Sequence, residues 1–261
     1  MPELPELEKV TDALRIRIKG KKLGEPVLIN PKVVIGDVKD VAGKTIEDIK
    51  RRGKWIVLSL DGLYITFHLR LNGYIFLLDS KEKETYDLAI FPLDGEYLHF
   101  GDPRKLAQVR ITKDIRSLEE DLGVDPFSSN FTVDYLSRKL KGKKTNIKTF
   151  LMDQNIISGI GNTYADEILF DAKIHPRKSC NDINQEEVKK LYNSIINILQ
   201  EAIKLGGTST EEFTNLIERD RFFEPKVHRR EGEACPICGT PIVMEKIGGR
   251  GTYYCPRCQR I

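Results

Sequence analysis

The 261-residue sequence lacks any apolar run near the roughly 20 residues that a membrane-spanning helix needs. Its first ten residues, MPELPELEKV, are acidic and lack the apolar centre of a secretory signal. Cysteine is scarce and unevenly placed: four of the five lie between Cys235 and Cys258, which does not resemble a disulfide framework. We therefore expect a soluble protein of a reducing cytoplasm, with no membrane association.

An excess of charge of either sign is also missing, since the net charge is only +3. The distribution is more informative. Residues 138–148 carry six Lys or Arg and no acid, residues 219–261 carry nine basic and five acidic residues, and residues 114–134 carry six acids against Arg116. Basic stretches separated by an acidic connector favour an anionic partner such as nucleic acid, although a solvated helix surface is the alternative.

Two patterns divide the chain. Residues 5–19 predict a helix, because apolar residues from Leu7 to Ile18 recur at helical spacing and Gly20 follows. Short β-branched and aromatic segments come next and are typical of a sandwich or barrel: 27–29, 55–60, 63–69, 73–78, 86–93, 96–102 and 106–112. After an expected linker at 122–132 the pattern turns helical, over 133–140, 146–154, 162–172 and 185–207. The length and pattern predict an α+β chain of two compact domains with a small appendage.

The clustered cysteines form two CxxC pairs, Cys235 with Cys238 and Cys255 with Cys258, with 16 residues between the pairs. This spacing is typical of a zinc ribbon whose hairpin turns at Gly248–Gly249 and carries Arg250 at its tip. Four thiolates leave no open coordination position, so one structural zinc ion is predicted. Two redox pairs or unrelated thiols are the alternatives. Cys180 is isolated and is expected to be an ordinary thiol.

The N-terminal PELPE segment has its own possible chemistry. Pro2 becomes a free secondary amine if Met1 is removed, and an N-terminal amine titrates near pH ~8. Such an amine can form an iminium ion with a sugar C1′, and Glu3 and Glu6 lie close by as possible acid or base groups. Acids in the first turn of a helix are also favoured by its dipole, and on these residues alone we prefer that interpretation.

Six motifs occur in order along the chain: PELPELE, RRGK (51–54), HLRLNG (68–73), FGDPRK (100–105), DQNIISGIGNTYADEILF (153–170) with IHP, and CPICG…GGRGTYYCPRCQ. Together they resemble the bacterial formamidopyrimidine-DNA glycosylase family, which includes the endonuclease VIII-like enzymes. The resemblance covers essentially the whole chain. With the patterns above, it implies an N-terminal helix and β-sandwich catalytic domain (1–128), a helix–two-turn–helix DNA-binding domain (129–225) and a zinc ribbon (226–261), with DNA between the domains.

The resemblance also implies roles for individual residues. Pro2 would be the nucleophile, Glu3 the acid/base group and Glu6 a supporting residue. Lys54 would bind phosphate beside the lesion, although a lysine at a sheet edge is the alternative. The residues expected to contact DNA are His68, Leu71, Arg104, Leu106, Lys148, Asn162 and Arg250.

The segment around GIGN supports phosphate binding independently. Gly159 and Gly161 let the backbone approach a phosphate, and the following helix start offers free N–H groups beside Asn162. An ordinary loop with a helix cap is the alternative. Apolar residues on either side of this loop are expected to form core: Leu151, Ile156, Ile160, Tyr164 and Ile168.

Three features depart from the family pattern. Leu71 and Leu106 stand where Met and Phe are usual, in positions that fill the hole left by a flipped base; burial in the β core is the alternative for both leucines. Residues 208–231, which correspond to the segment capping the flipped base, contain no Gly and include ERDRFFEP. VHRR (227–230) replaces a VYGR-like stretch.

The resemblance implies a monomeric enzyme that acts on damaged double-stranded DNA. It would be a bifunctional DNA glycosylase and AP lyase for oxidised bases of the formamidopyrimidine and 8-oxoguanine class. The alternatives are an oxidised-pyrimidine enzyme of the same superfamily, a non-catalytic binder of damaged DNA, and an RNA- or ribosome-associated zinc-ribbon protein. The last leaves PELPE unexplained.

Overall fold

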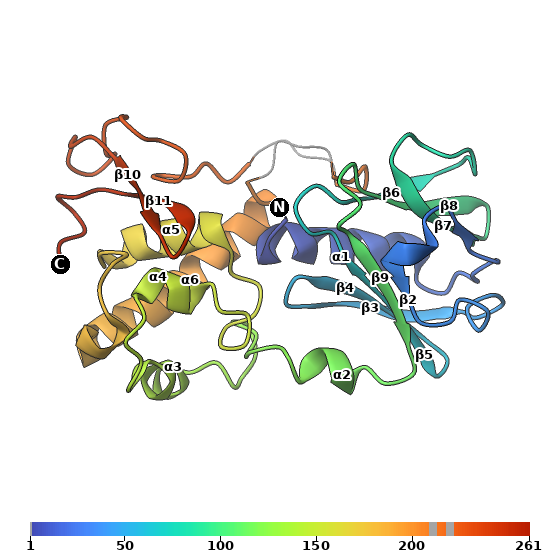
Figure 1. The fold of residues 1–261 in the computed structure, drawn as a ribbon, viewed down its shortest axis with the longest axis horizontal. Coiled ribbons are helices and arrows are strands. Elements are labelled where there is room, and N and C mark those ends of the chain that lie inside the picture. The colour runs from blue at the N-terminus through green and yellow to red at the C-terminus, as the bar shows by residue number, and fades with distance from the viewer. Residues whose placement is uncertain (1, 209–212, 218–221) are drawn as a thin grey trace. The chain divides into compact units, whose positions relative to one another are not determined.

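The computed structural model describes residues 2–208, 213–217 and 222–261, and these residues form two units (Figure 1). The β unit contains residues 2–120 and the described residues between 209 and 222. The helical unit contains residues 121–208 and 223–261, so it includes the cysteine-rich tail. The predicted division into three domains, with boundaries after residues 128 and 225, stays a prediction.

The β unit begins with a helix and continues as two sheets. Its elements are α1 (Leu4–Ile18), β1 (Val27–Leu28), the 3-10 turn Pro31–Val33, β2 (Val34–Ile35), β3 (Ile46–Arg52), β4 (Trp55–Leu60), β5 (Leu63–His68), β6 (Tyr74–Leu78), β7 (Asp87–Leu93), β8 (Glu96–Gly101), β9 (Gln108–Thr112) and α2 (Arg116–Glu119). One sheet has the order β1-β7-β8-β6, and the other has the order β2-β9-β5-β4-β3. All pairs are antiparallel except β2 with β9.

The core of this unit lies between the two sheets. Phe67 of β5 packs edge-on against Phe91 of β7 at 5.4 Å between ring centroids, and it lies 5.3 Å from Phe100 of β8. The apolar stripe of α1, from Leu7 to Ile18, is buried in the same core. The predicted helix and sandwich are confirmed. The seven predicted strand segments all contain strands, whereas β2 and β3 were not predicted.

The helical unit contains α3 (Val133–Leu140), α4 (Ile147–Leu151), α5 (Asn162–Ala172), the 3-10 turn Cys180–Asp182, α6 (Gln185–Leu205), β10 (Val243–Ile247) and β11 (Arg250–Tyr254). Side chains of Thr132, Asn146 and Asn184 cap α3, α4 and α6 by accepting first-turn N–H groups. The five residues predicted as core around the GIGN loop are all buried. The antiparallel pair β10–β11 forms the predicted hairpin, and in Figure 1 it lies beside α5.

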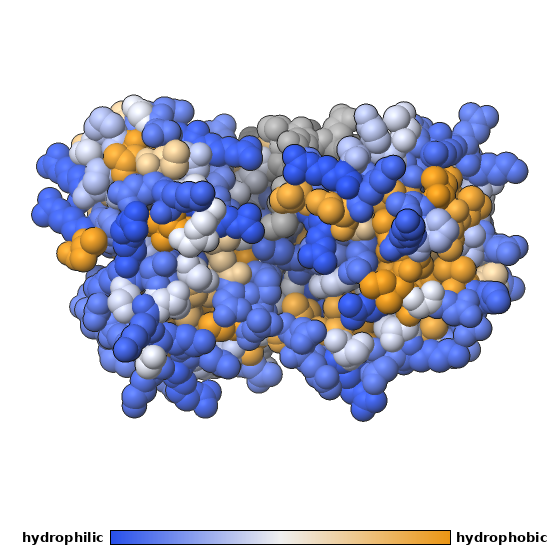
Figure 2. All heavy atoms as spheres, in the orientation of Figure 1, coloured by the Kyte–Doolittle hydropathy of each residue, from blue (hydrophilic) through white to orange (hydrophobic). Residues whose placement is uncertain are grey.

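Hydrophilic side chains cover most of the surface seen in Figure 2, and hydrophobic ones gather in patches over the strands of the β unit. Within the described ranges, no helix is both long and apolar enough to cross a membrane.

Candidate functional site

The N-terminus is held by reciprocal hydrogen bonds between two glutamates. Glu3 is the N-cap of α1 and its side chain accepts the backbone N–H of Glu6, while Glu6 Oε2 accepts the N–H of Glu3 at 2.9 Å. Both carboxyl groups are buried, and so is Pro2. The structure thereby brings Pro2, Glu3 and Glu6 together at the start of α1. Met1, whose removal would free the Pro2 amine, lies outside the described residues.

A tight hairpin turn carries Lys54 and is tied to the same helix. Arg52 pairs with Trp55, so Gly53 and Lys54 alone form the turn, and Gly53 has the positive φ of 55° that such a turn requires. Arg51 forms an ion pair with Glu8 of α1 and donates to Gly53 O at 3.1 Å. Lys54 is buried in this turn rather than extended from a sheet edge.

His68 ends β5 with a fixed ring orientation. Its ring lies edge-on to Trp55 at 4.7 Å, and its Nδ1 accepts the backbone N–H of Arg70 at 3.0 Å. Burial, followed by the charges of Arg70 and Lys54, lowers the pKa of His68 to about 3. The ring is therefore neutral near pH 7, and since Nδ1 accepts, its proton is assigned to Nε2 as a donor.

The two loops that follow β5 and β8 expose the leucines singled out in the sequence. Leu71 is 39% exposed and Leu106 is 55% exposed, and Arg104 is exposed beside Leu106. Burial of these leucines in the β core, the alternative interpretation, is therefore wrong. Both side chains are available at the surface of the β unit.

Asp102, which sequence reasoning missed, organises the second loop. Its buried carboxylate accepts three backbone N–H groups, from Arg104 at 2.9 Å and from Leu106 and Ala107 at 2.8 Å each. Lys105 takes a positive φ of 56° within the turn. An Asp before a Pro is a common turn signal, and it could have predicted this role.

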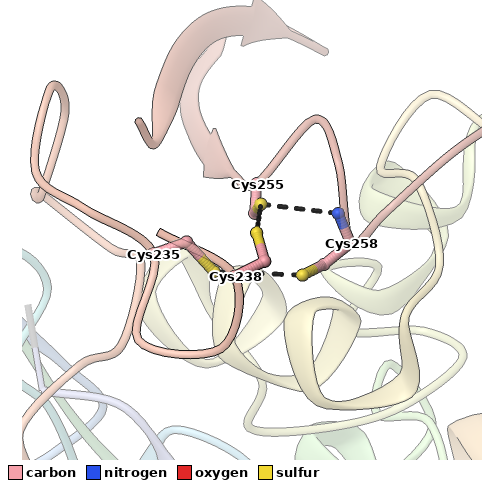
Figure 3. A group of neighbouring side chains, drawn as sticks. All are labelled: Cys235, Cys238, Cys255 and Cys258. Atoms are coloured by element: carbon pink, nitrogen blue, oxygen red, sulfur yellow. Dashed lines mark hydrogen bonds between the residues drawn. The ribbon is translucent and has the colours of Figure 1, made fainter. Parts of the chain in front are cut away.

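The four clustered cysteines converge from two loops, as Figure 3 shows. Their sulfur atoms all lie within 4.8 Å of one another, with Cys235 3.9 Å from Cys258 and Cys238 3.4 Å from Cys255. A tetrahedral zinc ion with Zn–S bonds of about 2.3 Å sets neighbouring sulfurs about 3.8 Å apart. The donor set therefore fits one structural zinc ion, and Cys180 lies apart as a buried thiol.

The turn of the zinc ribbon packs directly on α4 and α5. A Cβ atom on Gly248, whose φ is 57°, would lie 2.5 Å from Thr149 Oγ1, so a larger residue here would displace the Thr149 hydroxyl. Asn162 Nδ2 donates to Gly251 O at 3.0 Å. These contacts support the turn from which Arg250 is exposed.

Lys148 contacts the protein instead of solvent. It is 1% exposed, and its Nζ donates to Gly251 O at 3.1 Å and to Thr252 Oγ1 at 2.7 Å and forms an ion pair with Asp166 at 2.8 Å. An ammonium group has three protons, and three protein acceptors surround this one. The side chain therefore holds the ribbon turn in place, and a contact of Lys148 with phosphate stays a prediction.

The acidic pair that begins the second turn of α5 was also missed. Asp166 Oδ2 contacts His228 Nδ1 at 2.7 Å, and Glu167 accepts the backbone N–H groups of Lys226, Val227 and His228 at 2.7 to 3.0 Å. Burial raises the pKa of Glu167 and the three N–H donors oppose that rise. Two adjacent acids inside an apolar helical segment were the available signal.

Three family models match successive parts of the chain. They are the formamidopyrimidine-DNA glycosylase N-terminal domain over residues 1–109, the formamidopyrimidine-DNA glycosylase H2TH domain over 122–214, and the zinc finger found in FPG and IleRS over 232–261. A formamidopyrimidine-DNA glycosylase of Lactobacillus helveticus is 40% identical over 275 residues, covering 100% of this chain and 99% of that protein.

Solved structures of Lactococcus lactis FPG are similar over the whole chain. A point mutant in complex with a Fapy-dG containing DNA has a TM-score of 0.93 at 34% identity, covering 100% of both chains. The wild-type enzyme in complex with an oxidised pyrimidine containing DNA has a TM-score of 0.91 at 34% identity, again covering 100% of both chains.

The zinc site yields a first prediction. Cys238→Ser should lower bound zinc well below one ion per chain, because a closed site of four thiolates loses one ligand. Zinc content by elemental analysis checks this. Cys180→Ser is the matched control and should keep the full content; a Cys238→Ser protein that retains one zinc per chain would contradict the assignment.

The Asp102 loop yields a second prediction. Asp102→Ala removes the acceptor of three backbone N–H groups and should destabilise the protein by about 1–3 kcal/mol, the usual effect of leaving buried donors unpaired. Denaturant unfolding measures this, and amide hydrogen exchange of Leu106 and Ala107 should accelerate. Asp102→Asn keeps a carbonyl acceptor and should lose less; equal losses would show that the hydrogen bonds do not hold the loop.

Proposed function

The chain belongs to the formamidopyrimidine-DNA glycosylase family, and from this membership we infer that it is a DNA glycosylase that excises oxidised bases from damaged double-stranded DNA in base excision repair. We further propose that it acts as a monomer in the bacterial cytoplasm, where its DNA substrate lies. One structural zinc ion belongs to the helical unit.

The observation that carries the catalytic proposal is the paired-glutamate start of α1. Pro2 is assigned as the nucleophile, acting through the secondary amine that is free once Met1 is removed. The Pro2 nitrogen forms a bond to C1′ of the damaged nucleotide as the bond from C1′ to the base breaks, and the base leaves with that electron pair and takes up a proton. The target base must be flipped out of the duplex before this nitrogen can reach C1′.

Glu3 then handles the proton needed to open the sugar. The nitrogen loses its proton, the C1′–O4′ bond breaks, Glu3 donates a proton to O4′, and an iminium ion remains at C1′. The iminium ion draws electrons from C2′, so loss of a C2′ proton expels the 3′ phosphate. A second elimination expels the 5′ phosphate and completes the AP lyase reaction. Glu6 holds the Glu3 backbone in position for these steps.

Each unit offers cationic or hydrogen-bonding groups for phosphate. In the β unit we assign Lys54 and the Nε2–H of His68 to phosphates beside the lesion. In the helical unit we assign Asn162, at the start of α5, and Arg250, at the ribbon tip. Lys148 supports Arg250 through the ribbon turn and is not assigned a phosphate.

The exposed loop residues of the β unit are suited to fill the space that a flipped base leaves in the duplex. Leu71 and Leu106 supply apolar side chains that can insert between bases, and Arg104 supplies hydrogen-bond donors for the orphaned partner base. Most of the predicted capping segment, residues 208–231, is described, but 209–212 and 218–221 lie outside the described residues. Trapping against a lesion panel of three duplexes, which contain an oxidised purine, an oxidised pyrimidine and an abasic site, measures the lesion preference.

Trapping of the covalent intermediate tests the nucleophile. Wild-type protein should form a borohydride-stable adduct with a duplex that contains an abasic site, and Pro2→Gly should lose most of it, since the ring-constrained secondary amine is replaced by a primary one. Gel separation of protein bound covalently to DNA gives the yield.

Glu3→Gln is the companion variant, because it keeps an acceptor for the helix cap. It should bind the damaged duplex and lose base excision. An undiminished adduct with Pro2→Gly, or an adduct from protein whose Met1 is retained, overturns the assignment of Pro2; absence of any wild-type adduct across the lesion panel favours a non-catalytic DNA-binding protein.

Arg104 and Leu106 should affect different steps. Arg104→Ala should flatten the preference among the four bases opposite the lesion, because a base-edge contact is worth about 1–3 kcal/mol of discrimination. Leu106→Ala should slow excision of an intact damaged base more than cleavage of a preformed abasic site. Single-turnover rates of both steps opposite each partner base measure these effects. An unchanged partner ranking in Arg104→Ala would falsify its role in reading the opposite strand.

A further inference from the structure

The outer face of the five-stranded sheet holds the guanidinium of Arg110. Arg110 lies on β9 opposite Thr66 of β5, and its Cζ lies 5.7 Å from the centroid of the Trp55 ring. Among the residues that the structure describes, no carboxylate pairs with Arg110, and its Nε is buried without a hydrogen-bond partner. By contrast, Arg52, on the adjoining part of the sheet, pairs with Glu119 at 2.9 Å.

The aromatic contact holds this cation without neutralising it. A guanidinium over an indole face gains about 0.5–1 kcal/mol at an exposed site, from the electrostatic attraction of the ring. The ring offers no lone pair to the five N–H donors of the group. Partial burial of a cation in this state is unfavourable, so the arrangement favours an added anion with several acceptor oxygens.

The neighbours of Arg110 place it beside residues already assigned to DNA. Trp55 contacts both Arg110 and His68, and Thr66 and His68 project to the same face of β5 because they are two residues apart. Two residues along a strand, the separation between Thr66 and His68, correspond to about 7 Å. Over this distance one DNA strand presents about two phosphates along the helix axis. The charges that act on the neighbouring His68 ring are the cations of Arg70 and Lys54.

We propose that Arg110 binds a backbone phosphate of the DNA in addition to the phosphates assigned to Lys54 and His68, and that Trp55 holds its guanidinium in place for that contact. The ligand class is a phosphodiester, and the inference rests on the proposed function. Arg110 would then extend the phosphate-binding surface along β9, away from the lesion.

The salt dependence of binding tests this directly, because each neutralised phosphate contributes about 0.9 to the slope of log K against log salt concentration. The probe is a labelled duplex that contains tetrahydrofuran, a stable abasic-site analogue, and fluorescence anisotropy gives its affinity for the full-length protein. Arg110→Gln should make the slope shallower by about 0.9, with a loss of affinity that grows as salt is lowered.

Two further variants make the result decisive. Arg110→Met keeps an unbranched side chain that can pack over the indole and removes the charge, so it should reproduce the change in slope if Arg110→Gln does not fold. Arg116→Ala is the matched control, since Arg116 is exposed and already pairs with Asp114 at 2.8 Å, and it should leave the slope unchanged. Trp55 is the sole tryptophan, so the denaturant midpoint of its emission change reports whether each variant remains folded.

Each outcome has a distinct meaning. An unchanged slope in folded Arg110→Gln and Arg110→Met overturns the inference. Arg110 would then have only a packing role against the Trp55 ring. An equal change of slope in Arg116→Ala also overturns the inference, because loss of any cation from the β unit would then alter the salt dependence. A wild-type protein that binds no damaged duplex contradicts the proposed function itself, and with it the inference.

Discussion

The candidate site depends on order at the extreme N-terminus of the chain, where residues are usually the least constrained. The reciprocal hydrogen bonds of Glu3 and Glu6 supply that order by satisfying N–H groups that a helix start leaves unpaired. The apolar stripe of α1 then fixes the helix in the core of the β unit. The Arg51–Glu8 ion pair ties the turn that carries Lys54 to the same helix. These three contacts act on the same short segment, so they would hold the proposed nucleophile at position 2 in a fixed place.

Much of the fold followed from periodicity and spacing alone. The stripe of α1 and the paired CxxC motifs were predictable because each repeats a simple geometric requirement. Strand β3 was not predicted, because its sequence IEDIKRR is mostly charged and its buried positions do not alternate cleanly. The roles of the N-terminal glutamates were ambiguous from local chemistry, since helix capping and proton transfer use the same residue types. Only the family resemblance favoured a catalytic role.

The roles of charged residues were the least predictable part of the site. Lys148 lies in a basic stretch, where a lysine that binds phosphate is expected. Its side chain instead contacts Asp166 and two residues of the ribbon, which are about a hundred positions away in the sequence. The exposure of Leu71 and Leu106 was equally inaccessible, because a leucine beside a strand is usually buried. In each case the role of the residue depends on a long-range contact or on a loop conformation, and neither can be read from a local sequence pattern.

The contact between Lys148 and the ribbon turn links metal binding to the stability of the helices. The ribbon supplies two of the three acceptors around a buried ammonium, and the same Asp166 that completes the set also accepts the backbone N–H of Tyr253. If the zinc ligands are lost and the turn departs, the Lys148 ammonium on α4 loses its two acceptors on the ribbon, which is an unfavourable change. The metal therefore does more than fold its own hairpin: its binding free energy is shared with α4 and α5, so that loss of zinc and loosening of the helical unit become one cooperative transition.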